Sequence, residues 1–193
     1  REPRAFLVTN WSEGADEILA RSGIDSVADL RDKRVAVEPA SLDLLVLAVA
    51  LDRADVPFDA VERITMAQAR MPAAMAEGKV AAAVTYPPAS IAIRETTEAT
   101  AVFTTQEAPR SVIDLLISDR TLIQRRRDAL VRLARVFDRA RAFLRANPDE
   151  ARRIIARREG ITPSELKGIL EGIHLLGLAA QTELWREDGP EVH

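Results

Sequence analysis

The chain has 193 residues, of which 47% are hydrophobic and 30% are charged, and its formal net charge is −3. This balance is typical of a globular protein and gives no reason to expect a nucleic-acid partner, because 27 basic side chains stand against 30 acidic ones. The absence of cysteine excludes thiol nucleophiles, cysteine–zinc sites and disulfides, and two histidines cannot build a histidine-rich metal site. We therefore expect no metal and no cofactor.

The first two thirds of the chain alternate short apolar runs with helical patterns. Residues 5–9 predict a strand, followed by a polar loop at 10–14 and a short helical or extended piece at 15–20. Further strands are expected at 60–65, 80–85, 101–104 and 112–117, with helices at 68–77 and 89–94. Strands that alternate with helices indicate an α/β fold with a largely parallel sheet.

The stretch from Lys33 to Leu51 is the most informative part of the sequence. Residues 33–37 read as a buried strand, Pro39 marks a tight turn, and a helix is expected to open at Ser41. A strand, a turn and a helix N-terminus make an anion site, in which Ser41 and the backbone N–H groups after Pro39 would donate. A plain helix cap uses the same geometry. Glu38, next to this spot, argues against a bare anion or for a ligand that also carries an amine.

After Ser118 the pattern becomes helical. Apolar residues recur at helical spacing from Leu130 to Leu144, and Asn147-Pro148 and Thr162-Pro163 are strong helix starts. The last third is therefore predicted to be a run of helices. His174 is placed on one of these, with a structural role more expected than a ligand role.

Several further side chains are candidates for ligand contact because they follow predicted strands. Trp11 and Ser12 lie on a strand-exit loop, where Trp11 would stack on a ligand or else be a half-buried core residue. Thr85 and Tyr86 end another strand, and Tyr86 would otherwise cover the sheet edge. Asp16 would pair with a ligand amine or form a structural ion pair, and Arg110 would clamp an acid group or be solvated. The expected ligand-binding set is Asn10, Trp11, Ser12, Ala40, Ser41, Thr85, Tyr86 and Arg110.

Four stretches resemble, in order and spacing, the substrate-binding proteins of ABC importers. They are Ser12-Glu13-Gly14-Ala15-Asp16, the run from Gly23 to Val37, Gly78 to Val84 followed by Pro88, and Ala146-Asn147-Pro148-Asp149-Glu150-Ala151. The branch that they resemble comprises nitrate, sulfonate and taurine binders and the NMT1-like thiamine-pyrimidine binders. The chain departs from the family pattern at Asp32, Ala81 and Pro87, where the family prefers glycine, aspartate and an acidic residue.

The resemblance implies a type II periplasmic-binding-protein fold with two lobes. Residues 1–25 would supply a crossing strand and loop of lobe 1, residues 26–100 would form lobe 2, and residues 101–193 would return to lobe 1 as helices. Family members are considerably longer and begin with elements that have no counterpart here. We therefore interpret the chain, which opens with Arg1-Glu2-Pro3-Arg4 and shows no signal peptide, as a truncated member or a mature product.

The function that the resemblance implies is solute binding in the periplasm, or elsewhere outside the cytoplasm at the membrane. The ligand would be a small organic acid or anion, such as an alkylsulfonate or nitrate-like ion, or a small heterocycle held in an interlobe cleft. The protein would deliver it to an ABC permease and, if complete, act as a monomer. Two alternatives stay open, a ligand-sensing domain and an enzyme of pyrimidine-precursor or menaquinone synthesis. The residues themselves offer no nucleophile–base pair, so we expect no catalysis.

Overall fold

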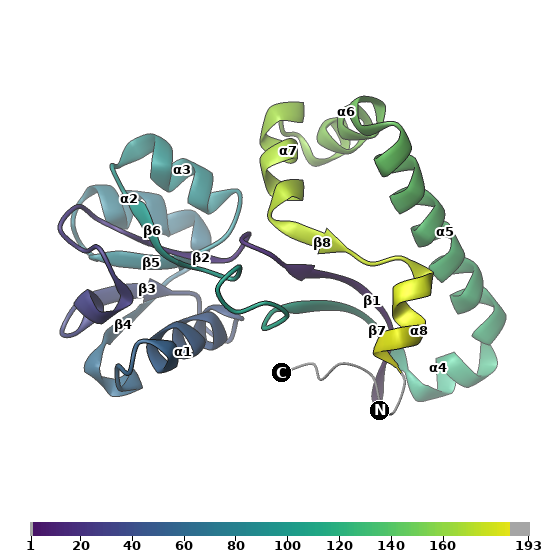
Figure 1. Cartoon of the computed structure of the whole chain (residues 1–193), viewed down its shortest axis with the longest axis horizontal. Helices are drawn as coiled ribbons and strands as arrows, with labels where there is room; N and C mark the ends of the chain where they lie inside the picture. Colours follow the sequence, from purple (N-terminus) through teal and green to yellow (C-terminus); the bar gives the residue numbers. More distant parts are fainter. Residues whose placement is uncertain (1, 186–193) are drawn as a thin grey trace. The chain divides into compact units, whose positions relative to one another are not determined.

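The computed structural model describes residues 2–185 of the chain (Figure 1). These residues form two compact units. The first unit joins the residues up to Trp11 to those from Ile113 onward, and the second is Ser12–Val112. The boundaries expected from the resemblance, after residues 25 and 100, both fall inside the second unit.

The second unit is built on a five-stranded sheet with the order β4-β3-β5-β2-β6. Its strands are β2 (Glu17–Ala20), β3 (Arg34–Val37), β4 (Glu62–Thr65), β5 (Ala82–Thr85) and β6 (Thr100–Thr104). β3 pairs in parallel with β4 and β5, whereas β2 is antiparallel to β5 and β6. Four strands therefore run in one direction, and the largely parallel sheet predicted from the sequence is confirmed.

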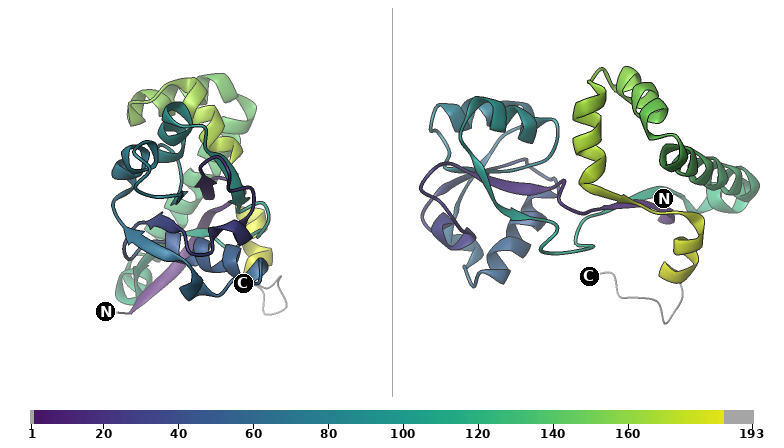
Figure 2. Two further views of the ribbon diagram at one scale, coloured as in Figure 1. Left: turned by 90° about the vertical axis from the view of Figure 1, so that its left-hand side faces the viewer. Right: turned by 45° about the horizontal axis from the view of Figure 1, so that its top comes forward.

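Helices cover both faces of this sheet (Figures 1 and 2). They are α1 (Asp43–Arg53), α2 (Met71–Ala76) and α3 (Ala89–Thr96), with 3₁₀ turns at Val27–Leu30, Phe58–Ala60 and Gln68–Arg70. Val35 and Val37 point into a core with Leu47 of α1, whereas Ala36 packs with Met75 and Ile93 of α2 and α3. This period-2 division of β3 is what a strand buried on both faces requires.

Most of the local signals in the sequence act as expected. Ser26 and Thr162 each form a capping box with the acidic residue three positions later. Gly78 ends α2 with a φ of 69°. The helix predicted at 68–77 is divided, because its first residues form a 3₁₀ turn and α2 begins only at Met71.

The first unit contains a three-stranded sheet with the order β7-β1-β8. β1 (Pro3–Ser12) lies between β7 (Ile113–Asp119) and β8 (Ile173–Leu175), and β1 and β7 are antiparallel. The helices of this unit are α4 (Arg120–Arg125), α5 (Arg127–Ala146), α6 (Pro148–Glu159), α7 (Pro163–Glu171) and α8 (Leu178–Leu184). None of the helices within residues 2–185 has the length and apolar character that crossing a bilayer requires.

The expectation that His174 lies on a helix is wrong, because Ile173–Leu175 is strand β8. Glycines at 172 and 177 bracket this segment, and the Leu176 N–H donates to the carbonyl of Thr9 in β1 over 2.9 Å. A short apolar run fits a helix and a strand equally well, so periodicity could not separate the two. The His174 ring instead stacks on Trp11, with ring centroids 4.5 Å apart.

Candidate functional site

The candidate site lies at the carboxyl ends of two neighbouring parallel strands of the second unit. Glu38 directly follows β3, Thr85 ends β5, and Tyr86 comes next. This edge of a parallel sheet is where ligands of α/β proteins usually bind, because the connecting loops converge there. Hydrogen bonds link these residues to Asp43 and Gln68.

Asp43 is the most deeply buried member of this network. Its side chain has no exposed surface, and its Oδ2 accepts hydrogen bonds from the Glu38 N–H at 2.7 Å and from Gln68 Nε2 at 2.9 Å. Its Oδ1 is buried without a hydrogen-bond partner among the described residues. Burial raises the pKa of the Asp43 carboxyl to about 6, because a charge there is poorly solvated.

Gln68 holds the two strand ends together. Its Nε2 donates to Asp43 and also to the carbonyl of Val84 at 3.2 Å, while its Oε1 accepts from the Thr85 hydroxyl at 2.9 Å. Because Nε2 faces two acceptors and Oε1 faces a donor, the orientation of the Gln68 amide is fixed. The Gln68 amide is therefore fully hydrogen-bonded, whereas Asp43 Oδ1 next to it has no partner among the described residues.

Glu38 and Tyr86 form the half-buried, outer part of the network. The Glu38 carboxylate accepts from the Gln68 N–H at 3.3 Å and from the Tyr86 hydroxyl at 3.4 Å. Both hydrogen bonds are long, and no ion pair within residues 2–185 includes Glu38 or Asp43. Burial raises the pKa of Tyr86, and the carboxylates of Glu38, Asp43 and Asp16 raise it further. The site is thus negatively charged, and the Glu38 carboxylate can accept further hydrogen bonds.

Ser41 closes the turn between β3 and α1. Its hydroxyl donates to the Glu38 carbonyl at 2.9 Å and accepts from the Asp43 N–H at 3.2 Å. The helix begins at Asp43, two residues later than expected, with Leu42 at the N-cap position, so Ser41 contacts this first helical N–H from the turn before the cap. Ala40 adopts a left-handed backbone with a φ of 54°. The carboxylate of Asp43 already lies in the first turn of the helix, and this weakens the case for an anion at this point.

Ser12 is the last residue of β1, and Asp16 lies in the loop before β2; both belong to the second unit. The Ser12 hydroxyl lies 2.7 Å from the Thr105 hydroxyl and accepts from the Asp16 N–H at 3.1 Å. The charge of Asp16 also contributes to the raised pKa of Asp43. This loop therefore adds a third carboxylate to the electrostatic environment of the network.

Five of the eight expected site residues take other places, Ser12 and Ala40 as described above and Asn10, Trp11 and Arg110 as follows. Asn10 donates to the Asp114 carboxylate at 2.8 Å, and Trp11 stacks on His174, with both residues in the first unit. Arg110 is half-buried in the loop before β7 and has a φ of 65°. The structure therefore joins Ser41, Thr85 and Tyr86 in one network.

Two central residues of the network, Asp43 and Gln68, were missed by sequence reasoning. An aspartate inside the apolar run that forms α1 was the available signal for Asp43, because a buried carboxylate needs partners. No comparable signal marks Gln68, since a glutamine before an alanine- and methionine-rich helix is ordinary. No group of three or more potential ligands within residues 2–185 could hold a metal ion.

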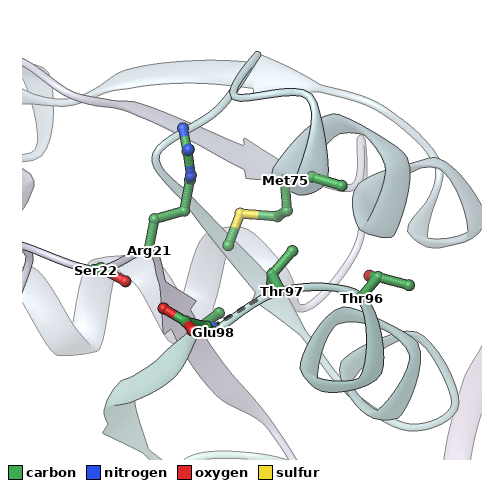
Figure 3. A pocket seen from close by; sticks show the side chains of 8 residues that line it. Arg21, Ser22, Met75, Thr96, Thr97 and Glu98 are labelled. Atoms are coloured by element: carbon green, nitrogen blue, oxygen red, sulfur yellow. Dashed lines mark hydrogen bonds between the residues drawn. The ribbon is translucent and has the colours of Figure 1, made fainter.

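A separate pocket of about 240 Å³ lies at the opposite edge of the same sheet. Arg21 follows the end of β2, which pairs with the first residues of β5 and β6. Figure 3 shows Arg21, Met75, Thr97 and Glu98 around this pocket. The Thr97 hydroxyl accepts from the Ala99 N–H, so it serves the local turn. This pocket is distinct from the network described above.

Residues 17–151 match the family model described as NMT1/THI5 like. The chain belongs to this family. No curated protein is similar enough in sequence to match it.

Solved structures with the same fold include two sulfonate-binding proteins and an enzyme. The periplasmic aliphatic sulphonate binding protein SsuA from Escherichia coli is 18% identical, with a TM-score of 0.78. The alkanesulfonate-binding protein SsuA from Xanthomonas axonopodis pv. citri is 19% identical, with a TM-score of 0.76. The desulfurization enzyme DSZB is 16% identical, covers 84% of this chain and 62% of its own, and has a TM-score of 0.67.

The match covers 93% of this chain but only 63% and 64% of the two sulfonate-binding proteins. The chain thus spans less than two thirds of their length. At these identities the likeness establishes the fold, that of the type II periplasmic binding proteins, and the sequence-based fold prediction is confirmed. Both binding proteins and an enzyme use this fold.

Proposed function

We propose that this chain is the solute-binding component of an ABC importer that works outside the cytoplasm. Membership of the NMT1/THI5-like family and the shared fold with periplasmic sulfonate-binding proteins support this role. The partners would be a small-molecule ligand and a membrane permease. The network at the carboxyl ends of β3 and β5 supplies polar groups where such a ligand would be held.

The ligand class follows from the charge of that network. A small organic acid, an alkylsulfonate or a small heterocycle would all suit the family, but a bare anion would meet Glu38 and be repelled. A ligand that presents a protonated amine or a heterocyclic amino group would instead donate to Glu38 and Tyr86. The long hydrogen bonds of the Glu38 carboxylate are the observation that carries this choice, because a ligand donor can replace or add to them.

Each residue of the network has a separate role in this proposal. Glu38 and Tyr86 contact the ligand, because they are the half-buried members. Asp43 and Gln68 position Glu38. The Asp43 carboxylate accepts from the Glu38 backbone N–H, and the Gln68 backbone N–H donates to the Glu38 carboxylate. Thr85 holds the Gln68 amide in place. Binding without a chemical step is the role that these groups suit, since the network contains no nucleophile paired with a base.

A ligand sensor would bind in the same way, and an enzyme remains the alternative because DSZB shares the fold. Incubation of the chain with taurine or aminopyrimidines, followed by mass analysis of the small molecule, separates binding from catalysis. We expect the compounds to be recovered unchanged. Conversion at a rate proportional to protein concentration would replace the binding role with an enzymatic one.

Thermal-shift screening against sulfonates, nitrate, carboxylates, amines and aminopyrimidines tests the proposed role. A ligand at 100 times its dissociation constant stabilises the folded protein by about 2.7 kcal/mol, which raises the melting temperature by several degrees. We expect shifts from compounds with an amino group. Nitrate or an unsubstituted alkylsulfonate as the only active compounds would contradict the proposed ligand class, and a flat response to every compound would contradict solute binding.

A further inference from the structure

Asp43 is the one member of the candidate network whose carboxyl group is completely buried. It has no exposed surface, and no ion pair within residues 2–185 includes it. A buried carboxylate without a positive partner is costly, because nothing replaces the hydration that the charge has lost. A ligand that brings a positive charge to this network would therefore act first on the charge state of Asp43.

The hydrogen bonds of Asp43 show which of its oxygens holds the proton of the neutral form. Oδ2 accepts from the Glu38 N–H at 2.7 Å and from Gln68 Nε2 at 2.9 Å, and both of these partners are donors. Oδ1 is buried without a partner among the described residues, so the proton is on Oδ1. A buried O–H group without an acceptor is also unfavourable. Neither charge state of Asp43 is fully satisfied, and a nearby charge can shift the balance between them.

The charges that act on Asp43 from the neighbouring elements are negative. Burial is the largest cause of its raised pKa, and the carboxylates of Glu38, after β3, and of Asp16, in the loop before β2, raise it further. Tyr86, after β5, is uncharged at neutral pH, because its own pKa lies above the ordinary value of 10. The 3₁₀ turn before α2 contributes the neutral amide of Gln68. A positive charge at Glu38 would offset the repulsion that opposes ionisation of Asp43.

On the basis of the function proposed above, we infer that the site binds its ligand as a cation and that Asp43 releases its proton when the ligand binds. The O–H bond at Oδ1 breaks, the proton passes to bulk water, and Oδ2 keeps its hydrogen bonds to Glu38 and Gln68. The ligand class narrows to protonated amines, because a neutral heterocyclic amino group brings no charge to compensate the new carboxylate.

Ligand binding and proton release are reciprocal by thermodynamic linkage. A cation that weakens the hold of Asp43 on its proton binds more tightly where Asp43 is already ionised. The folded-state pKa of about 6 places this change around that pH, so the affinity for a cationic ligand rises from pH 5 to pH 7. The rise over these two pH units is at most about tenfold, since one group loses one proton. An anion without an amine shows no such rise, because the ionised Asp43 repels it.

Titration calorimetry of the chain with taurine and isethionate at pH 5 and pH 7 tests the release of the proton. Isethionate has a hydroxyl group where taurine has an ammonium group, so both compounds have a hydrogen-bond donor but only taurine has the positive charge. Taurine should bind about three- to tenfold more tightly at pH 7, and isethionate should not. Asp43→Asn should reduce the pH effect on taurine to less than about twofold, whereas Asp52→Asn, at an exposed carboxylate near the other end of α1, should retain it.

A taurine affinity that is equal at both pH values would overturn the inference and leave the proposed function in place, whereas no binding of taurine at either pH would overturn both.

NMR of the ligand-free natural chain gives a second test that needs neither a ligand nor a folded variant. The Glu38 N–H donates directly to Asp43 Oδ2, so its ¹⁵N signal should shift with a midpoint near pH 6. A Glu38 amide signal that is constant between pH 5 and pH 7 would overturn the inference, because Asp43 would then have no proton to release in this range.

Discussion

The side-chain amide of Gln68 donates to the carboxylate of Asp43 over 2.9 Å, and both side chains are buried. The two residues are 25 positions apart in the sequence, at the start of α1 and before α2. This hydrogen bond ties the start of α1, which follows β3, to the 3₁₀ turn that follows β4. It is the centre of the network that we propose positions Glu38 for a ligand.

Loss of the Gln68 side chain should destabilise the second unit substantially. Gln68→Ala leaves Asp43 with one hydrogen bond fewer and the Thr85 hydroxyl without its acceptor, so we expect the free energy of unfolding to fall by about 2–3 kcal/mol. Urea denaturation measures this change. Gln106→Ala, at an exposed glutamine of the same unit, serves as control and should change stability by less than about 0.5 kcal/mol. Equal effects of both substitutions would show that the network contributes nothing.

The raised pKa of Asp43 predicts a specific dependence of stability on pH. The folded-state pKa is about 6 against an ordinary value of 3.8, so the folded protein holds the proton more tightly. The protonated Asp43 carboxyl therefore stabilises the folded protein fully below pH 3.8, and this stabilisation is lost as the pH rises through about 6. The loss is on the order of 3 kcal/mol.

Asp43→Asn isolates this effect from the raised pKa of Glu17, which acts in the same direction. The amide keeps the acceptor for Gln68 and cannot ionise. We expect the variant to gain stability relative to the natural chain as the pH rises from 4 to 7, as measured by thermal unfolding across that range. A constant difference between the two proteins would mean that Asp43 does not titrate in this window.

The left-handed backbone of Ala40 predicts that glycine is favoured there. A φ of 54° is strained for an L-residue, so Ala40→Gly should raise the free energy of unfolding by about 0.5–1 kcal/mol. Ala48→Gly in the middle of α1 is the matched control and should lower it by about 1 kcal/mol. If both substitutions destabilise the protein equally, the turn after β3 does not have this conformation.

The stacked rings of Trp11 and His174 predict a measurable coupling between β1 and β8. The rings are nearly parallel, with an interplanar angle of 5°. Removal of the imidazole in His174→Ala should cost about 0.5–1 kcal/mol and change the fluorescence of Trp11. His174→Phe keeps an aromatic partner and should restore most of the stability. Identical stability of the alanine and phenylalanine variants would argue against the stack.

The order of strands and helices in the second unit was predictable except for β2, which the sequence left open between a helix and a strand, because apolar runs, capping boxes and breakers agree elsewhere in the unit. β8 was not predictable, since its three residues carry no period of their own and are held by β1. The approximate place of the candidate site followed from the strand ends at Val37 and Thr85. The role of Gln68 could not be predicted from the sequence, because it depends on contacts with residues that are distant in the chain.

The most direct measurement of the central claim is an NMR titration of the ¹⁵N-labelled chain with two matched compounds, taurine and ethanesulfonate. They differ by one amino group, which we propose Glu38 recognises. Taurine should shift the amide signals of residues 38–43, 68 and 85–86, with an affinity at least tenfold higher than that of ethanesulfonate, and Glu38→Gln should remove the difference. Equal affinities of the two compounds for the natural chain, or shifts at residues elsewhere, would contradict the account.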